Sequence, residues 1–191
     1  MGHSLVSRVR TNRQIKPKKL RDPIHDNNDT LGLEFFLTRE YDRAIEQERK
    51  VLELDPNFIE AYYFRGVAYL KKSMYEEGMA EFEKGVAISP LSTEALTGLG
   101  YGYAVTGRRA EARKVLDKLN ELSKHEYVSA VWRAKIYAGL EEKDKAFEWL
   151  EEAYEDRSIV SVGFIKTNSM FDPVRPDPRY ADLLQRTNPQ P

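Results

Sequence analysis

The side chains that most often carry acid–base, nucleophilic or metal chemistry are sparse in this sequence. The chain has three histidines, His3, His25 and His125, and no cysteine. No carboxylate or nucleophile pattern surrounds these histidines, and the lack of cysteine excludes disulfides, thiolate nucleophiles and cysteine-bound zinc or iron–sulfur clusters. We therefore expect no catalytic residue, no metal site and no cofactor.

Two further patterns with chemical potential also have plainer explanations. The glycine-rich run from Gly98 to Gly102 resembles a phosphate loop, but no strand is predicted before it and no Gly-Lys-Ser/Thr follows it. Paired acids such as Glu76-Glu77 and Glu151-Glu152 fall on polar helix faces. The sequence thus predicts a protein that is not an enzyme.

A period of 34 residues runs through most of the chain and predicts its organisation. Small or aromatic residues recur at this spacing in three series: Gly32, Gly66, Gly100 and Ala134; Phe35, Tyr69, Tyr103 and Tyr137; Ala44, Gly78, Ala112 and Ala146. No insertion or deletion interrupts the register. Four copies of one unit are expected, over 25–58, 59–92, 93–126 and 127–158.

Each unit is expected to be a pair of helices. Apolar residues follow i, i+3, i+4, i+7 spacing over 59–71 and again over 75–88. Pro56 and Pro90 separate successive pairs, because proline fits a first helical turn but not a helix interior. The expected helices are 26–38, 41–54, 58–71, 75–88, 92–105, 108–121, 126–139 and 143–156.

The period and its landmark residues resemble the tetratricopeptide repeat (TPR) family. The second block carries the pattern most clearly, with Tyr62, Gly66, Tyr69, Phe82 and Pro90. The first block departs from it by placing Glu48 where an aromatic is usual. The resemblance implies an all-α fold, a right-handed solenoid of four helical hairpins with a C-terminal capping helix, which acts by protein–protein interaction.

The resemblance also implies a concave groove lined by the first helix of each hairpin. Carried onto this sequence, the family's groove positions place Gly98 between two large aromatics, Phe64 and Trp132. The expected lining residues are Tyr63, Phe64, Val67, Gly98, Tyr101, Trp132 and Lys135. One interpretation is a hollow over Gly98 that binds a partner segment through these aromatics. The other is that the aromatics pack against the protein's own C-terminal tail.

The expected ligand follows from the charges at the groove. Some TPR proteins bind a carboxylate through lysine, arginine and asparagine side chains at fixed groove positions. Counted from the first residue of each block, the fifth and ninth positions do not hold that set in this sequence. Glu60 and Glu94 would add negative charge to the rim. An apolar or mildly basic segment of a partner of unknown identity is therefore expected.

Residues 1–24 form a basic arm, predicted to be a linker. Positions 8–21 hold seven Lys and Arg side chains and no acid. Such an arm can bind nucleic acid through phosphate neutralisation, and this stays an alternative function. The arm has no aromatic for base stacking, however, which favours the linker.

The C-terminal residues 159–191 are predicted to cap the fourth hairpin. An apolar run is followed by Asp172-Pro173 and Asp177-Pro178, each of which offers an N-cap with proline at the first helical position. The longer stretch from Tyr127 through Phe171-Asp172-Pro173 to Tyr180 also resembles the ends of repeat regions attached to bacterial signalling proteins, such as transcription regulators and kinases. The resemblance implies a sensor or docking part of a larger signalling system.

Composition agrees with a soluble, all-helical chain. Hydrophobic residues make up 41% of the sequence, which suits the thin continuous core of a repeat array. There is no apolar run of about 18 residues that could span a membrane, and no apolar segment follows the basic N-terminus as in a signal peptide. We therefore expect a cytoplasmic protein with no membrane partner.

Overall fold

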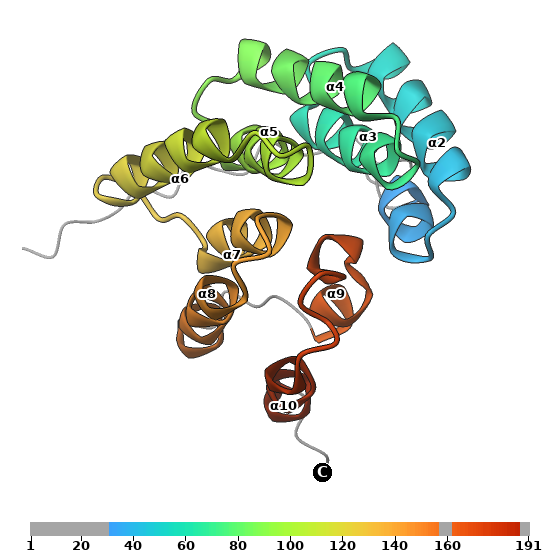
Figure 1. The fold of residues 1–191 in the computed structure, drawn as a ribbon. Coiled ribbons are helices and arrows are strands. Elements are labelled where there is room, and N and C mark those ends of the chain that lie inside the picture. Colours follow the sequence, from blue (N-terminus) through green and yellow to red (C-terminus); the bar gives the residue numbers. More distant parts are fainter. Residues whose placement is uncertain (1–30, 157–161, 188–191) are drawn as a thin grey trace, which may run out of the picture.

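The computed structural model describes residues 31–156 and 162–187, and every regular element within these ranges is a helix (Figure 1). Helical residues 31–37 come first. They are followed by α2 (Tyr41–Leu54), α3 (Ile59–Lys71), α4 (Tyr75–Ile88), α5 (Thr93–Val105), α6 (Arg109–Ser123), α7 (Ala130–Gly139), α8 (Lys143–Glu155), α9 (Val162–Thr167), the 3-10 helix η1 (Ser169–Phe171) and α10 (Pro178–Thr187). None of these helices is both long and apolar enough to cross a membrane.

The helices form successive hairpins, as the period predicts. α3 packs against α4, α5 against α6 and α7 against α8, while α3, α5 and α7 lie next to one another in turn. The helix bounds agree with the expected ones within a few residues, except at α7. α7 begins at Ala130 rather than 126, because the Ser129 side chain accepts a hydrogen bond from the backbone N–H of Val131 and so caps the helix there.

The turn inside each hairpin has the same geometry in all four units. Arg39, Ser73, Gly107 and Glu141 adopt positive φ angles, of 65°, 62°, 79° and 59°. The backbone N–H of the next residue bonds back to the carbonyl of the aromatic landmark, as in Met74 N to Tyr69 O at 3.0 Å and Arg108 N to Tyr103 O at 2.8 Å. This is the Schellman ending of a helix. The period therefore fixes the turns as well as the helices.

Close helix contacts require the small residues of the pattern. A Cβ built on Gly66 would lie 2.4 Å from the ring of Phe82, and a Cβ on Gly78 would lie 2.9 Å from the carbonyl oxygen of Gly66. α3 and α4 can therefore approach as they do only with glycine at these two positions.

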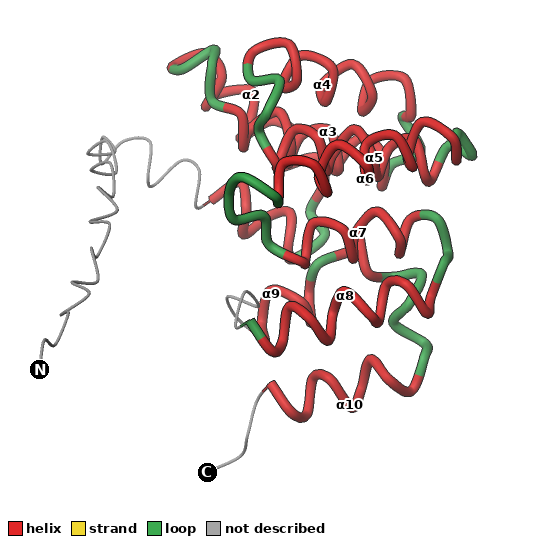
Figure 2. Tube along the Cα trace, turned by 90° about the vertical axis from the view of Figure 1, so that its left-hand side faces the viewer, coloured by secondary structure: helices red, strands yellow, loops and turns green. Residues whose placement is uncertain are grey.

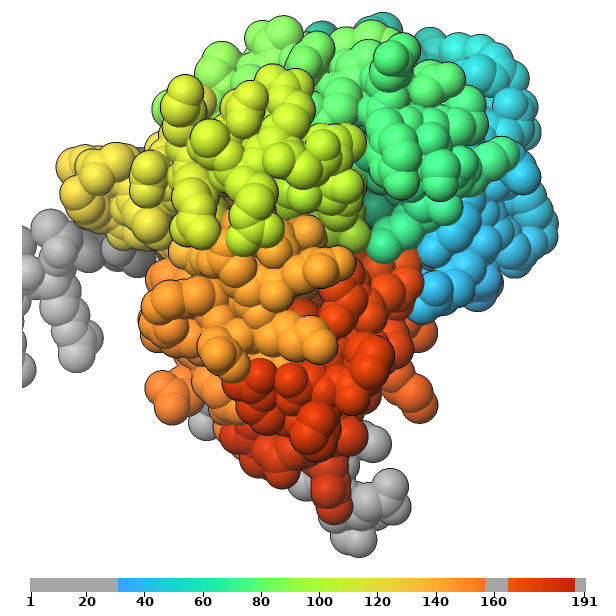
Figure 3. Space-filling model, in the orientation of Figure 1, coloured from blue at the N-terminus to red at the C-terminus, as the bar shows by residue number. Residues whose placement is uncertain are grey.

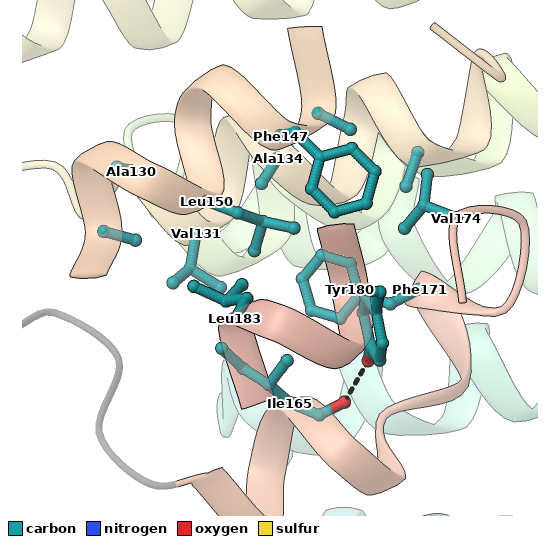
Figure 4. Close-up of a cluster of buried hydrophobic side chains, with 13 residues drawn as sticks. Ala130, Val131, Ala134, Phe147, Leu150, Ile165, Phe171, Val174, Tyr180 and Leu183 are labelled. Carbon is teal, nitrogen blue, oxygen red and sulfur yellow. Dashed lines mark hydrogen bonds between the residues drawn. The ribbon is translucent and has the colours of Figure 1, made fainter. Parts of the chain in front are cut away.

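The C-terminal segment packs on the fourth hairpin. Figure 2 shows α7, α8 and α10 stacked in succession. Phe171, Val174, Tyr180 and Leu183 join side chains of α7 and α8 in one buried cluster (Figure 4). The Tyr180 hydroxyl donates to the Ile165 carbonyl at 2.6 Å. This is the packing that a cap on the last hairpin needs.

The two Asp-Pro pairs behave differently. Asp177 does precede α10, and its Oδ1 accepts a hydrogen bond from the Arg179 backbone N–H at 3.1 Å. Asp172 starts no α-helix, so that part of the prediction is wrong: it ends η1, and its carboxylate bonds to Arg39 and Arg175 instead. The basic arm and the start of the expected first helix lie outside the described residues.

Candidate partner-binding face

The array curves, and the first helices α3, α5 and α7 line its inner side (Figure 1). Six of the seven predicted groove residues gather there in one cluster around Tyr63. Its ring lies 5.2 Å from that of Phe64 and 6.1 Å from that of Trp132. Val67 and Tyr101 belong to the same buried cluster, and the Lys135 ammonium lies 4.1 Å from the Trp132 ring centroid. We call this surface of α3, α5 and α7 the inner face.

Gly98 does not belong to the inner face, so the predicted hollow over it is wrong. A Cβ on Gly98 would meet the Phe82 ring of α4 at 2.4 Å. The glycine therefore serves the packing of α5 on α4. The repeat register predicts where Gly98 lies along its helix. It does not predict which neighbouring side chain occupies the space that a Cβ on Gly98 would take.

The protein's own C-terminal segment occupies the inner face. Met170 is fully buried, and its sulfur accepts a hydrogen bond from the Tyr63 hydroxyl at 3.0 Å. Lys71 Nζ donates to the Ser169 carbonyl at 2.6 Å and to the Tyr101 hydroxyl at 3.0 Å. Figure 3 shows the red C-terminal segment between the orange fourth hairpin and the green and blue first hairpins. Of the two interpretations of the aromatics, packing against the tail holds for Tyr63 and Tyr101.

An ion pair ties this segment to the first hairpin. Arg39 donates to both carboxylate oxygens of Asp172, at 2.9 and 2.7 Å, across 133 positions of sequence. Burial acts to raise the pKa of Asp172, but the hydrogen bond from Arg39 and the charge of Lys71 outweigh it and leave the pKa lowered. We call residues 168–172 the docked segment.

Lys135 and Lys71 lie under or beside the docked segment, and the pKa of each is lowered. Burial lowers the pKa of Lys135 to about 7 and that of Lys71 to about 8, because a charged ammonium is poorly solvated there. The charge of Glu94 partly opposes this for Lys135. Burial also raises the pKa of the Tyr63 and Tyr101 hydroxyls. Near neutral pH the inner face therefore carries less positive charge than its residues suggest.

Sequence reasoning missed the basic end of the inner face. Arg39, Lys71, Met170 and Asp172 were not among the expected site residues. Lys71 and Arg39 lie at the end of a first helix and in a hairpin turn, and repeat register assigns neither to the groove. Met170 lies in the expected cap, between its apolar run and Asp172-Pro173, but nothing local shows that it crosses to α3.

No cluster of three or more His, Asp or Glu side chains in the described ranges could hold a metal ion. The residues considered for nucleic-acid binding, 8–21, lie outside those ranges, so that alternative stays a prediction.

Comparison with known families and structures agrees with this architecture. A family described as TPR repeat matches residues 32–73, and one described as tetratricopeptide repeat matches residues 59–90. The chain is 27% identical over 119 residues to anaphase-promoting complex subunit 3 of Schizosaccharomyces pombe, a match that covers 62% of this chain. It spans only 18% of the length of that relative.

Two solved structures share the fold. A thermophilic TPR protein of Thermus thermophilus gives a TM-score of 0.57 at 20% identity, covering 85% of this chain and 87% of that one. PilW, a type IV pilus biogenesis factor, gives 0.54 at 15% identity, covering 87% of this chain and 79% of that one. Arrays of such repeats form extended concave surfaces that bind other proteins. The matched repeats, the unbroken register and the four similar hairpin turns lead to one conclusion: residues 32–90 are tetratricopeptide repeats, and the later hairpins repeat their architecture.

Proposed function

We propose that the protein binds an apolar or mildly basic segment of a partner protein on the inner face, between Phe64 and Trp132, as the docking part of a larger bacterial signalling system. The observation that carries the site is that part of each of these two aromatic side chains remains accessible to solvent. Both remain half-buried, although the docked segment and its neighbours bury Tyr63, Tyr101 and Lys135.

The acidic residues in the first turns of α3 and α5 support an apolar or mildly basic ligand. Glu60 and Glu94 lie in the first turns of α3 and α5. The Glu94 carboxylate accepts hydrogen bonds from the Ser92 and Thr93 hydroxyls, at 3.0 and 3.2 Å, which hold it in place. Aromatic rings beside fixed carboxylates attract apolar groups and cations together.

Two likenesses support the wider role. The curated relative is named as a subunit of a complex, which fits a scaffold that assembles with other proteins. The resemblance of the C-terminal residues to repeat regions of bacterial signalling proteins supports the signalling context.

The test compares the two tryptophans of the fourth hairpin. Trp132→Ala removes an inner-face ring, while Trp149→Ala removes one on α8, where Arg133 stacks over it at 4.6 Å. A partner captured from source lysate is identified by mass spectrometry, purified, and titrated against both variants by calorimetry. Trp132→Ala should weaken binding by at least about 2 kcal/mol, the scale of an interface hot spot, and Trp149→Ala by much less.

Circular dichroism first establishes that both variants fold. Unchanged affinity in a folded Trp132→Ala variant would contradict the proposed surface, as would equal losses in the two variants.

A further inference from the structure

We propose that the basic end of the inner face, where Met170 and Asp172 dock, is a second peptide subsite that the chain itself fills in the free protein. The subsite takes a partner segment in which a long unbranched apolar side chain is followed two residues later by a carboxylate. This inference rests on the proposed function, because it assumes that partners bind the inner face.

The contacts of the docked segment are those that a separate peptide could make. Lys71 Nζ bonds to a main-chain carbonyl, that of Ser169, so this contact is independent of side-chain identity. The Met170 side chain supplies apolar burial against Tyr63, and Asp172 supplies a carboxylate to the planar guanidinium of Arg39. Bidentate pairing of this kind selects a carboxylate in a defined orientation.

Neighbouring residues of the segment belong to different cores. Met170 packs in a cluster whose buried members come from the first three hairpins, among them Tyr63, Val67 and Tyr101. Phe171 packs in the cluster of α7, α8 and α10. Met170 and Asp172 can therefore leave the inner face while Phe171 and α10 keep the fourth hairpin covered.

The chain's own segment is an imperfect occupant. Among the described residues, Asn168 Nδ2 and Ser169 Oγ are buried and have no hydrogen-bond partner. Unpaired buried polar groups weaken an interaction. The Arg39 side chain is about half exposed and the Asp172 side chain about one-third exposed, so a competing carboxylate can reach Arg39 from solvent. A partner that keeps the side-chain carbonyl oxygen of Asn168, which accepts from the Met170 backbone N–H at 3.0 Å, and has an apolar group in place of Ser169 would bind more tightly than the docked segment does.

The experiment uses a labelled peptide with the sequence of residues 168–175 and full-length variants that weaken the internal contact. Met170→Lys places a third cation beside Lys71 and Lys135, and Asp172→Lys opposes Arg39. In fluorescence anisotropy, both variants should bind the peptide at least tenfold more tightly than the unaltered protein does. A scrambled peptide of equal composition should not bind.

Charge reversal then locates the peptide. Adding Arg39→Glu to the Met170→Lys variant, which keeps Asp172, should abolish binding of the peptide, and a peptide with lysine in place of its aspartate should restore it. Arg43→Glu is the matched control, since Arg43 lies on α2 and its ion pair is a local one with Glu40. Loss of peptide binding in Arg43→Glu, or none in Arg39→Glu, would overturn the assignment.

Hydrogen exchange separates this inference from the proposed function. If residues 168–172 exchange freely in the variants and the peptide still fails to bind, the subsite is refuted while the Trp132 test is unaffected. If the variants do not fold, excess peptide added to the unaltered protein should increase exchange at 168–172, and no increase would refute the subsite. The unaltered protein could instead dimerise as its concentration rises, with faster exchange at residues 168–172. That result would identify a second copy of the chain as the occupant and overturn the assignment to a partner protein.

Discussion

Lys135 donates a hydrogen bond from Nζ to the Tyr63 hydroxyl at 2.9 Å, although both side chains are buried. Tyr63 in turn donates to Met170, so a lysine of the fourth hairpin, a tyrosine of the second and the docked segment form one chain of contacts. The basicity of Lys135 is therefore coupled to the packing of three parts of the array.

Stability should rise with pH between about 7 and 10. The pKa is lowered in the folded state to about 7 for Lys135 and about 8 for Lys71, from 10.5. Above these values the folded protein has released protons that the unfolded chain still holds, so raising the pH favours folding by up to about 1.4 kcal/mol per pH unit for each lysine. Denaturant titrations at pH 7 and 9.5 measure this. Lys135→Met should reduce the slope, and an unchanged slope would show that Lys135 keeps its usual pKa.

Substitutions at Gly98 should destabilise the fold. Its Cβ would lie 2.4 Å from Phe82, so Gly98→Leu overpacks the α4–α5 contact and should cost about 1–3 kcal/mol despite a better helix propensity. An open hollow over Gly98, one of the two interpretations of the sequence, would instead accept the leucine without loss of stability. Gly85→Ala is the control, since its Cβ meets only Ala95, at 3.3 Å, and Tyr62, at 3.7 Å. A Gly98→Leu variant as stable as the unaltered protein in thermal melts would place Gly98 at an open surface after all.

The hairpin turns offer a stabilising change. Ser73 and Glu141 have φ angles of 62° and 59°, which side chains disfavour, whereas Gly107 adopts 79° without strain. Ser73→Gly and Glu141→Gly should each stabilise the protein by about 1 kcal/mol, and Gly107→Ala should destabilise it by a similar amount. Thermal unfolding of the three variants checks the sign at each turn. Destabilisation by both glycine substitutions would mean that the turns are not Schellman endings.

The cap should be essential for stability. Deleting residues 159–191 exposes the apolar surface of α7 and α8 that Tyr180 and Leu183 now cover, so the truncated protein should melt well below the intact one or aggregate. Tyr180→Ala, a milder change, should cost about 3 kcal/mol, since the side chain is fully buried. Tyr127→Ala is the control because Tyr127 is 69% exposed. Equal melting temperatures for truncated and intact protein would refute the cap.

The helices were predictable because repeats encode local structure. The spacing of Gly66, Tyr69 and Gly78 indicates a helix, a turn and a close helix contact within one stretch of chain, and the structure confirms the hairpins. The positive φ at Ser73 and Glu141 was not predictable from residue type, since neither is glycine.

The inner face was only partly predictable. Register placed Tyr63, Tyr101 and Lys135 on one surface, as found. It could not show that Met170 covers them, because that contact depends on how the chain folds back after the fourth hairpin. For the same reason Lys135 was expected to line an open groove, and its burial follows from a non-local contact.

The pair formed by Arg39 and Asp172 has a consequence for how the molecule folds. In an open repeat array each unit touches only its neighbours, so terminal units can fray while the centre stays intact. Here the first hairpin turn is joined to the C-terminal segment, 133 positions away, which closes the array into a loop. We expect the first hairpin to fray less while this pair is formed, and closure of this high-contact-order loop to be a slow step of folding.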